Sequence, residues 1–321
     1  MVSVVCPFYN EEIILAKAID LMIANLQSLE EEWELILVND GSLDTSLSIA
    51  TEKASRDQRV KVVTYANNQG RGHALRKGID AAQDDIIITT EIDCSWGDDI
   101  VLRLTAELDK HKYLDMVIAS PNLLKNGYVN VPFKRVFFSK IGNVFLGFMI
   151  TKKITMFTGM TRGYRAAAIK NLPTNEVGKE FHLDVITKAH ALGLKIGEIP
   201  ATLTWQDERL AKADAPKRNS SSNIKKIIFS HLVFGIGGRP FRYLFIVSLF
   251  SFLLSMAFLT WGIVNLFSGQ DSIYLLILSF STFILSVLLS GIGILSMQQS
   301  AILREIWFLH RELKETPDRK G

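Results

Sequence analysis

Hydrophobic residues change their spacing along this 321-residue chain and divide it into two parts. In the N-terminal third, short runs rich in valine, isoleucine and leucine alternate with stretches whose apolar residues recur every three or four positions. The first pattern predicts buried strands and the second predicts helices. The predicted strands are residues 2–6, 35–38, 60–65, 86–90 and 116–119, and the predicted helices are 11–26, 45–54, 72–81 and 100–110.

The alternation of strand and helix predicts an α/β fold with a mainly parallel sheet. Strands that are apolar throughout are typical of a sheet covered by helices on both faces. In such sheets, ligands bind beyond the carboxyl ends of the strands. The loops that follow the predicted strands are therefore the candidates for a functional site.

Two uncharged apolar runs, 243–267 and 273–297, follow near the end of the chain. A helix of about 25 residues reaches roughly 37 Å, enough to cross a hydrocarbon core about 30 Å thick. Basic residues flank the pair and are absent from the connection at 268–272; they are Arg239, Arg242, Arg304, Arg311 and Lys314. The positive-inside rule therefore predicts an integral membrane protein with two spans, with the N-terminal domain and both termini in the cytoplasm.

Net charge, cysteine content and the first residues indicate which ligands, disulfides and targeting signals to expect. The net charge of +3 is too small to indicate binding to nucleic acid. Cys6 and Cys94 lie far apart in the sequence, and the cytoplasm is a reducing compartment, so no disulfide is expected. Residues 1–6 have neither a basic start nor a long apolar stretch, and we expect no secretory signal there.

Polar, acidic or glycine-rich loops follow each of the first four predicted strands, at residues 7–12, 39–45, 67–73 and 91–95. Each alone would also suit an ordinary turn or helix cap. Together they place hydrogen-bond acceptors and glycine-rich, flexible backbone at one edge of the sheet. Asp40 could accept hydrogen bonds from a nucleobase, and Gly70 would let the backbone approach a ligand closely. No GxGxxG follows the first strand, which argues against a dinucleotide dehydrogenase.

Two carboxylates follow the fourth predicted strand, Glu91 and Asp93, with one residue between them. Carboxylate oxygens suit a hard divalent ion that also binds the oxygens of a diphosphate. Such an ion would neutralise the charge that develops on a phosphate leaving group. The pattern predicts a site for Mg²⁺ or Mn²⁺ at this loop.

Several of these stretches resemble one family. Ser3-Val-Val-Cys-Pro-Phe-Tyr-Asn-Glu-Glu12 and Val38-Asn-Asp-Gly-Ser-Leu-Asp-Thr-Ser46 are similar to the opening of the family 2 inverting glycosyltransferases of the GT-A fold. Asn68-Gln-Gly-Arg-Gly-His-Ala74 resembles its third motif, and Glu91-Ile-Asp-Cys-Ser95 falls where the family has its metal-binding Asp-x-Asp. Arg162-Gly-Tyr-Arg165, Phe181-His-Leu-Asp184 and Leu192-Gly-Leu-Lys-Ile-Gly-Glu-Ile-Pro200 resemble the polyprenyl-phosphate branch, which includes dolichol-phosphate mannose synthase. The resemblance covers about residues 2–230.

The resemblance implies a set of site residues. The nucleotide-sugar site would contain Pro7, Tyr9, Asn10, Glu11, Asp40, Gly70 and Asp93. The metal ligands would be Glu91, Asp93 and Ser95, and the lipid phosphate would face Arg135, Ser139 and Asn143. Catalytic roles would fall to Asp93, Asp184 and Arg162, with Asp184 orienting a substrate more than abstracting a proton.

The implied reaction is inverting transfer of a sugar from a nucleotide diphosphate sugar to polyprenyl phosphate, undecaprenyl or dolichyl, at the cytoplasmic membrane face. A lipid phosphate is already anionic near neutral pH, so its attack requires no general base. Transfer to another lipid or to a glycan is one alternative. A non-catalytic sugar-nucleotide-binding assembly partner is another.

Three positions depart from the family pattern. Glu91 replaces the usual first Asp of the metal motif, and Phe181-His-Leu-Asp184 stands where Phe-Gln-x-Glu is common. Pro121-Asn122 stands where a Ser-Arg pair is expected, so one phosphate-facing arginine is missing, and Lys125 is the nearest substitute in sequence.

The resulting domain organisation has four parts. Residues 1–222 form the GT-A domain, 223–240 a juxtamembrane segment, 241–298 a transmembrane hairpin and 299–321 a cytoplasmic tail. The tail is a candidate contact in a homo-oligomer.

Two segments within the GT-A domain have two interpretations each. Aromatic and basic residues at 131–157 predict an interfacial helix that lies on the bilayer; the alternative is a core helix whose lysines extend their charged ends to water. The polar stretch 206–222 is either an active-site lid, with Arg209 or Arg218 contacting the diphosphate, or a solvated linker.

Overall fold

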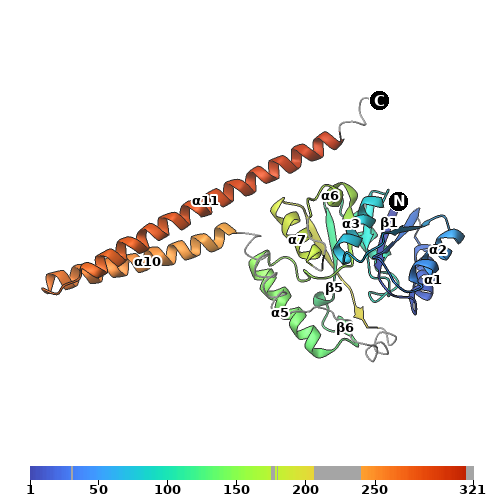
Figure 1. Cartoon of the computed structure of the whole chain (residues 1–321), viewed down its shortest axis with the longest axis horizontal. Coiled ribbons are helices and arrows are strands. Elements are labelled where there is room, and N and C mark those ends of the chain that lie inside the picture. The colour runs from blue at the N-terminus through green and yellow to red at the C-terminus, as the bar shows by residue number, and fades with distance from the viewer. Residues whose placement is uncertain (30–31, 175–177, 179, 206–239, 316–321) are drawn as a thin grey trace. The chain divides into compact units, whose positions relative to one another are not determined.

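The computed structural model describes residues 1–29, 32–174, 178, 180–205 and 240–315. The predicted lid with Arg209 and Arg218, most of the juxtamembrane segment and the end of the tail lie outside these residues. The chain divides into two units, Met1–Gly235 and Ile236–Gly321. Figure 1 labels several of the elements of each.

The first unit is built on a seven-stranded sheet in the order β3-β2-β1-β4-β7-β5-β8. Its strands are β1 (Val2–Phe8), β2 (Trp33–Asn39), β3 (Val60–Thr64), β4 (Ile86–Thr89), β5 (Met116–Ser120), β7 (Arg162–Arg165) and β8 (Ile196–Pro200). Neighbouring strands are parallel except at β7, which runs antiparallel to both β4 and β5. The predicted mainly parallel α/β sheet is confirmed.

Helices connect the strands and cover the sheet. They are α1 (Leu15–Leu26), α2 (Ser46–Arg56), α3 (Arg71–Ala81), α4 (Ile100–Lys110), α5 (Phe133–Met149), α6 (Ala166–Lys170) and α7 (Phe181–Ala191). Crossovers between parallel strands are right-handed. Because the chain moves outward from β1 to β3 and then returns to β4 on the other side of β1, α1 and α2 lie on one face of the sheet and α3 on the other.

The predicted helix start at residue 11 is wrong, since α1 begins at Leu15. Residues 11 and 12 are instead tied to the loop after β2. The Glu11 amide donates to Ser46 Oγ at 2.8 Å and the Glu12 amide to Asp44 Oδ2 at 3.2 Å. These contacts hold residues 11 and 12 beside the second loop. A turn follows, in which the Glu11 carbonyl accepts from the Ile14 and Leu15 amides, and the regular helix begins after it.

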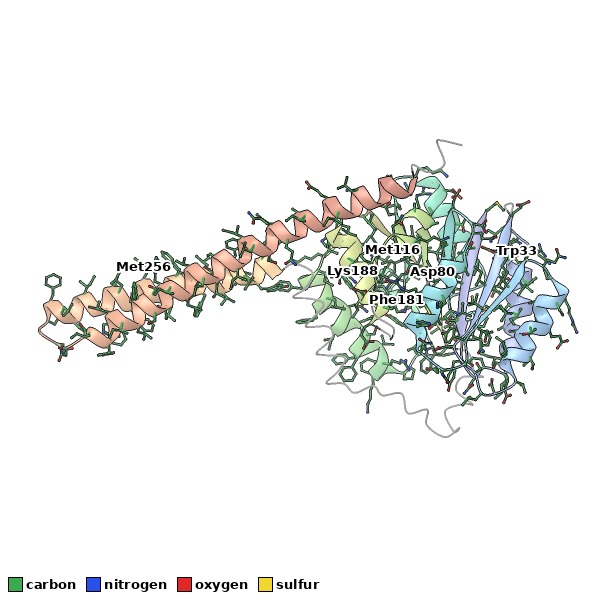
Figure 2. The ribbon with its side chains drawn as sticks, turned by 45° about the horizontal axis from the view of Figure 1, so that its top comes forward. Trp33, Asp80, Met116, Phe181, Lys188 and Met256 are labelled. Carbon is green, nitrogen blue, oxygen red and sulfur yellow. The ribbon has the colours of Figure 1, made fainter. Side chains whose placement is uncertain are left out.

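Close packing of α3 on the sheet depends on one glycine. A Cβ atom at Gly78 would lie 2.2 Å from Val5 Cγ1 and 2.9 Å from Val38 Cγ2. Since Val5 and Val38 are fully buried in β1 and β2, a larger residue would push the helix away. The helix that carries Arg71 is thereby fixed against the central strands. Figure 2 shows the side chains that fill this core.

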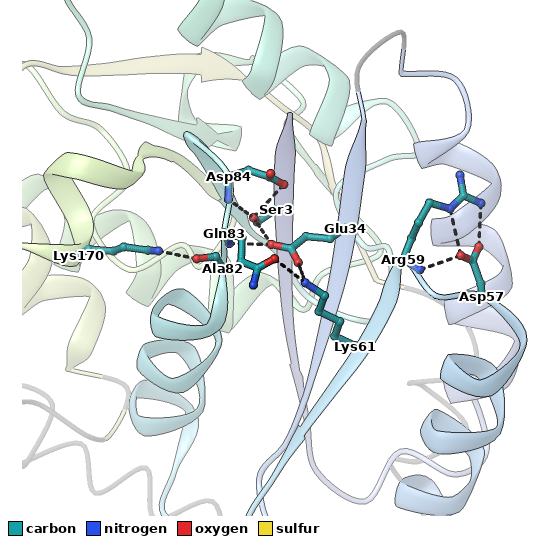
Figure 3. Close-up of polar contacts among 9 residues, drawn as sticks. All are labelled: Ser3, Glu34, Asp57, Arg59, Lys61, Ala82, Gln83, Asp84 and Lys170. Carbon is teal, nitrogen blue, oxygen red and sulfur yellow. Dashed lines mark hydrogen bonds and ion pairs between the residues drawn. The ribbon is translucent and has the colours of Figure 1, made fainter. Parts of the chain in front are cut away.

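A polar cluster closes the amino ends of the central strands, opposite the functional loops (Figure 3). Glu34 is 7% exposed and accepts from Ser3 Oγ at 2.6 Å, from the Gln83 amide at 2.8 Å and from Lys61 Nζ at 2.5 Å. Burial alone would raise the pKa of Glu34, but hydrogen bonds from Lys61, Ser3 and the Gln83 amide hold it below its usual value. This cluster links β1, β2, β3 and the start of β4.

The second unit is a pair of long helices, α10 (Pro240–Phe267) and α11 (Ile273–Glu315). Within them, Tyr243–Phe267 and Ile273–Gln299 are long and apolar enough to cross a membrane. Serine hydroxyls join the helices: Ser255 and Ser279 each donate to the carbonyl of the other, at 2.9 and 3.0 Å. Ser248 Oγ lies 2.7 Å from Ser290 Oγ, and Ser251 Oγ donates to the Thr282 carbonyl at 2.9 Å. The hairpin is therefore held by polar contacts along its length, as is typical of helix pairs in lipid.

Candidate functional site

Loops from the carboxyl ends of β1 and β2 are joined by reciprocal hydrogen bonds. The Asn10 amide donates to Ser42 Oγ at 3.1 Å, and Asn10 Oδ1 accepts from the Leu43 amide at 2.8 Å. Asn10 has a φ of 52°, a left-handed conformation that asparagine tolerates better than most residues. Of the predicted nucleotide-sugar residues, Asn10 and Glu11 are thus brought beside the Asp40 loop.

Asp40 organises the neighbouring loop. It is 5% exposed, and its carboxylate accepts from Tyr65 Oη at 2.7 Å, from Asn68 Nδ2 at 3.0 Å and from the Gln69 amide at 2.9 Å. The Gly70 amide donates to the same carboxylate at 3.1 Å. Burial, together with the hydrogen bond to Asp40 and its charge, raises the pKa of Tyr65. Asp40 therefore fixes the position of Gly70, and in this structure its oxygens are directed into the loops.

The three predicted metal ligands share one turn after β4. Ser95 Oγ donates to Glu91 Oε2 at 3.0 Å, and the Ser95 amide donates to Asp93 Oδ1 at 3.3 Å. Between them Cys94 takes a φ of 52°, which bends the turn so that both acids lie near Ser95. Glu91 Oε1 also lies 3.5 Å from Arg71 Nη1, on α3. Asp93 is 6% exposed and Glu91 is partly exposed.

This all-oxygen donor set fits a hard divalent ion. In the described part of the chain, no group of three or more His, Cys, Asp or Glu side chains is placed to hold a metal alone. Mg²⁺ is commonly bound by one or two carboxylates, with the remaining positions filled by water and substrate phosphate oxygens. Two acids and a hydroxyl at the rim of a sheet match that arrangement.

Arg162, predicted to be catalytic, lies in the core. Its side chain is fully buried, and its guanidinium donates to the carbonyls of Phe157 at 2.7 Å, Gly159 at 2.8 Å and His182 at 3.1 Å. Burial lowers the pKa of Arg162. The contacts tie the segment before β7 to the first residues of α7, so the geometry favours a positioning role over contact with substrate.

Helix α7 carries the predicted Asp184 and a histidine that the sequence did not single out as a site residue. Asp184 is 4% exposed and forms an ion pair with Lys188, one turn along, at 2.8 Å. Figure 2 labels Phe181 and Lys188 near the two ends of this helix. Neither ring nitrogen of His182 has a hydrogen-bond partner within the described residues, although the side chain is 3% exposed. Burial, then the charges of Arg162 and Arg71, lowers the pKa of His182 well below its usual value, so the ring is neutral.

The predicted lipid-phosphate residues lie one turn apart on α5 but differ in orientation. Asn143 is 4% exposed; its amide nitrogen donates to the Ser139 carbonyl at 2.9 Å and its Oδ1 accepts from the Phe157 amide at 2.8 Å. It therefore anchors the segment after α5. The Arg135 guanidinium lies over the Trp205 ring, 4.9 Å from its centroid.

Tyr128 and Lys140 join this group, and sequence reasoning missed both. Tyr128, on the two-residue strand β6 (Tyr128–Val129), donates from its hydroxyl to Asn122 Oδ1 at 2.9 Å. Lys140 Nζ lies 5.7 Å from the centroid of the Tyr128 ring. The only signal in the sequence was that Lys140 directly follows Ser139; the approach of Tyr128 arises from tertiary structure. Lys125, the substitute suggested by sequence, is exposed.

A short second sheet links the acidic turn of Glu91, Asp93 and Ser95 to the Tyr128 strand. Strand β9 (Leu203–Thr204) pairs in parallel with β6, and the Thr204 amide donates to the Ser95 carbonyl at 2.8 Å. The Trp205 amide donates to the Val129 carbonyl at 3.0 Å. The segment 203–205 thus contacts the acidic turn through Ser95 and the Tyr128 strand through the paired backbone.

Helix α5 exposes a large aromatic surface. Phe133 is 80% exposed, Phe138 63% and Phe148 69%, whereas Leu146 on the opposite side is fully buried. Water-exposed aromatic residues at this density on one helix are unusual for a soluble surface. The exposure favours the predicted interfacial helix over the core-helix alternative.

Comparison with known proteins places this site in a family. Residues 3–172, more than half of the chain, match the model of glycosyl transferase family 2. The chain belongs to glycosyl transferase family 2. The match includes both acids of the metal turn and the loops around Asp40.

Two relatives have a polyprenol or undecaprenyl phosphate compound in their names. Polyprenol monophosphomannose synthase of Mycolicibacterium smegmatis is 26% identical over 243 residues, covering 74% of this chain and 87% of that protein. Undecaprenyl-phosphate 4-deoxy-4-formamido-L-arabinose transferase of Proteus mirabilis is 36% identical over 110 residues, 34% of each chain. The chain thus aligns with about a third of the length of the second relative.

A solved structure supports the GT-A fold. Glucosyl-3-phosphoglycerate synthase from Mycobacterium tuberculosis, crystallised with Mn²⁺, UDP-glucose and phosphoglyceric acid, has a TM-score of 0.53 and 17% identity. The alignment covers 73% of this chain and 79% of that one. At this identity the likeness concerns the fold of the sheet and its helices.

Proposed function

We propose that this chain is an inverting glycosyltransferase, anchored in a membrane by α10 and α11, that moves a sugar from a nucleotide diphosphate sugar to polyprenyl phosphate at the cytoplasmic membrane face. The observation that carries the proposal is the acidic turn Glu91–Asp93–Ser95 beside the Asp40 loops, in a family 2 chain with two apolar helices. Alignment along most of a polyprenol monophosphomannose synthase supports the acceptor class.

The donor would bind at the carboxyl edge of β1, β2 and β4. Asp40 holds the Gly70 backbone in place, and Asn10 fixes the first loop, so the nucleotide meets a preorganised surface. Asp93 and Glu91, with Ser95, would hold a divalent ion, which when bound neutralises charge on the departing diphosphate. The Mn²⁺ in the structurally similar M. tuberculosis synthase supports the use of a divalent ion.

The chemical step is an in-line displacement. A phosphate oxygen of the lipid attacks the anomeric carbon as the bond from that carbon to the diphosphate oxygen breaks, and the configuration inverts. No proton must be removed from the acceptor, because the phosphate is already ionised near pH 7. Asp184, held by Lys188, would orient a substrate, and Arg162 would position the segments around it.

The acceptor phosphate would lie against α5. Arg135 supplies a positive charge and Ser139 a hydroxyl. Lys140 and the Tyr128 hydroxyl would take the place of the missing arginine, which is expected beside Asn122. Lys140 supplies a cation, and the Tyr128 proton, donated to Asn122 Oδ1 in this structure, would turn to the phosphate when the acceptor binds. The exposed phenylalanines of α5 would lie in the headgroup region, where apolar burial and anionic lipids both favour binding.

The direct test is transfer from radiolabelled UDP- and GDP-sugars to undecaprenyl and dolichyl phosphate, with Mg²⁺, Mn²⁺ or EDTA. We expect one donor to label the lipid phase, and both EDTA and Asp93→Ala to abolish labelling. Asp99→Ala is the matched control, because Asp99 follows the turn but its side chain is 61% exposed. Metal-dependent nucleotide binding without any lipid product would instead indicate another acceptor or a non-catalytic role.

A further inference from the structure

Helix α11 carries a regular apolar row, here called the rear row: Ile292, Leu295, Gln299, Ile302, Ile306 and Leu309. Successive members are three and four residues apart in alternation. The five apolar members are 53–64% exposed. Alternating spacings of three and four give a period of 3.5 residues, which is the pattern of a helix seam that packs against another helix.

The rear row faces away from α10. On the α10 side, Ser290 contacts Ser248, and a Cβ atom at Gly293 would lie 3.4 Å from Phe245. A helix turns about 100° per residue, so Leu295 and Ile302 point roughly 160–180° away from Gly293. The helix that the 3.5-residue period predicts to pack on the rear row is therefore not α10.

The rear row also continues beyond the apolar span. That span ends at Gln299, while α11 runs on to Glu315. Phe245 of α10 lies against Gly293 of α11. Helix α10 begins five residues before Phe245, at Pro240, and runs antiparallel to α11, so its start is about level with residue 298 of α11. Ile302, Ile306 and Leu309 lie past both the span and α10. Lipid accounts for exposed apolar side chains within the span, but these three lie beyond it and are left exposed by the part of the chain that the structure describes.

We infer that α11 pairs with α11 of a second copy of this chain through the rear row. Every copy enters the membrane with the same orientation, so the two helices run parallel and equivalent residues meet at equal depth. Gln299 would then face its counterpart at the end of the span, where a polar pair fixes register. No Lys or Arg occupies a position of the rear row, so like charges are kept out of the seam. The inference rests on the membrane placement in the proposed function.

Cysteine crosslinking in native membranes tests the pairing. Ile302→Cys and Leu309→Cys, each in the full chain, should give a disulfide-linked dimer on mild oxidation, at least about five times more than Ala301→Cys. Ala301 is the matched control because it is exposed and adjacent but turned about 100° from the seam. The parent chain, with Cys6 and Cys94, measures the background. Adding Ile306→Asp to Ile302→Cys should remove the dimer.

Equal crosslinking at residues 301 and 302, or none at 302 and 309, would overturn the inference. Alkaline extraction of the same membranes separates this failure from that of the proposed function. A chain that washes off is not inserted, which would refute the membrane placement and the parallel pairing together. An inserted chain without crosslinks refutes the pairing alone, and crosslinks without sugar transfer support the pairing while refuting the proposed reaction.

Discussion

Exchanging Arg162 for methionine separates a positioning role from a catalytic one. The guanidinium donates to three buried carbonyls, those of Phe157, Gly159 and His182. Methionine keeps much of the volume and supplies no donor. The His182 carbonyl keeps the hydrogen bond within its own helix, α7, whereas the Phe157 and Gly159 carbonyls lose their partner. Each carbonyl left buried without a partner costs about 1–3 kcal/mol, so the variant should lose at least about 2 kcal/mol of unfolding free energy.

That loss corresponds to a measurable shift in melting temperature. For a unit of this size, 1 kcal/mol lowers Tm by about 2–4 °C, so Arg162→Met should melt about 4–8 °C or more below the parent. The assay is intrinsic tryptophan fluorescence of the full chain in detergent, with sugar transfer measured well below both transitions. Arg56→Met is the control; its side chain is 67% exposed, and its Tm should change by less than about 2 °C.

The two readouts distinguish the roles of Arg162. If it positions the segments around α7, Tm falls and transfer at low temperature is reduced but measurable. A variant with the parent's Tm and no transfer would refute the positioning role, because the arginine would then act on the substrate.

Three further results are expected. Glu34→Gln should lower the free energy of unfolding by about 1–3 kcal/mol at pH 7. Because Lys61 and the other donors lower the pKa of Glu34 in the folded state, the difference between variant and parent should shrink as the pH falls below the ordinary carboxyl pKa, and an equal difference at pH 3.5 in unfolding titrations would contradict the assignment. Tyr128→Phe should raise KM for polyprenyl phosphate about five-fold, as expected for one hydrogen bond, without changing KM for the nucleotide sugar; a change in the donor's KM would place Tyr128 elsewhere. Ser255→Ala combined with Ser279→Ala should weaken the hairpin by about 1 kcal/mol in detergent-denaturation titrations, and no change would show that packing alone holds the helices.

Much of the fold follows from the sequence because strong local patterns coincide with buried elements. The apolar runs around Val4, Ile36 and Ile118 became β1, β2 and β5, and helix α4 has the predicted bounds. The antiparallel strand β7 was not predicted. Its four residues include two arginines, and a Cβ atom at Gly163 would lie 3.0 Å from both Ile88 Cδ1 and Leu108 Cδ1, so the glycine gives these neighbours room to pack on the strand. Only the neighbouring elements make that segment a strand.

The geometry of the candidate site was predictable where its residues lie in a single loop. Glu91, Asp93 and Ser95 do share one turn, as their spacing suggests. The orientation of Asn143 into the protein depends on the Phe157 amide, 14 residues away, and helical spacing alone cannot reveal it. The placement of Tyr128 beside Lys140 likewise requires the second sheet.

The strand order has a consequence for synthesis on the ribosome. β1 to β4 pair with one another and can assemble as they emerge, but β7 lies between β4 and β5. Some 70 residues separate Thr89 from Arg162, which at about 5–20 residues per second is a delay of roughly 4–15 s. During that interval the β4 edge is unpaired and β5 awaits its neighbours. The nascent chain therefore presents an open strand edge, the kind of surface that chaperones protect from aggregation, until β7 has been made.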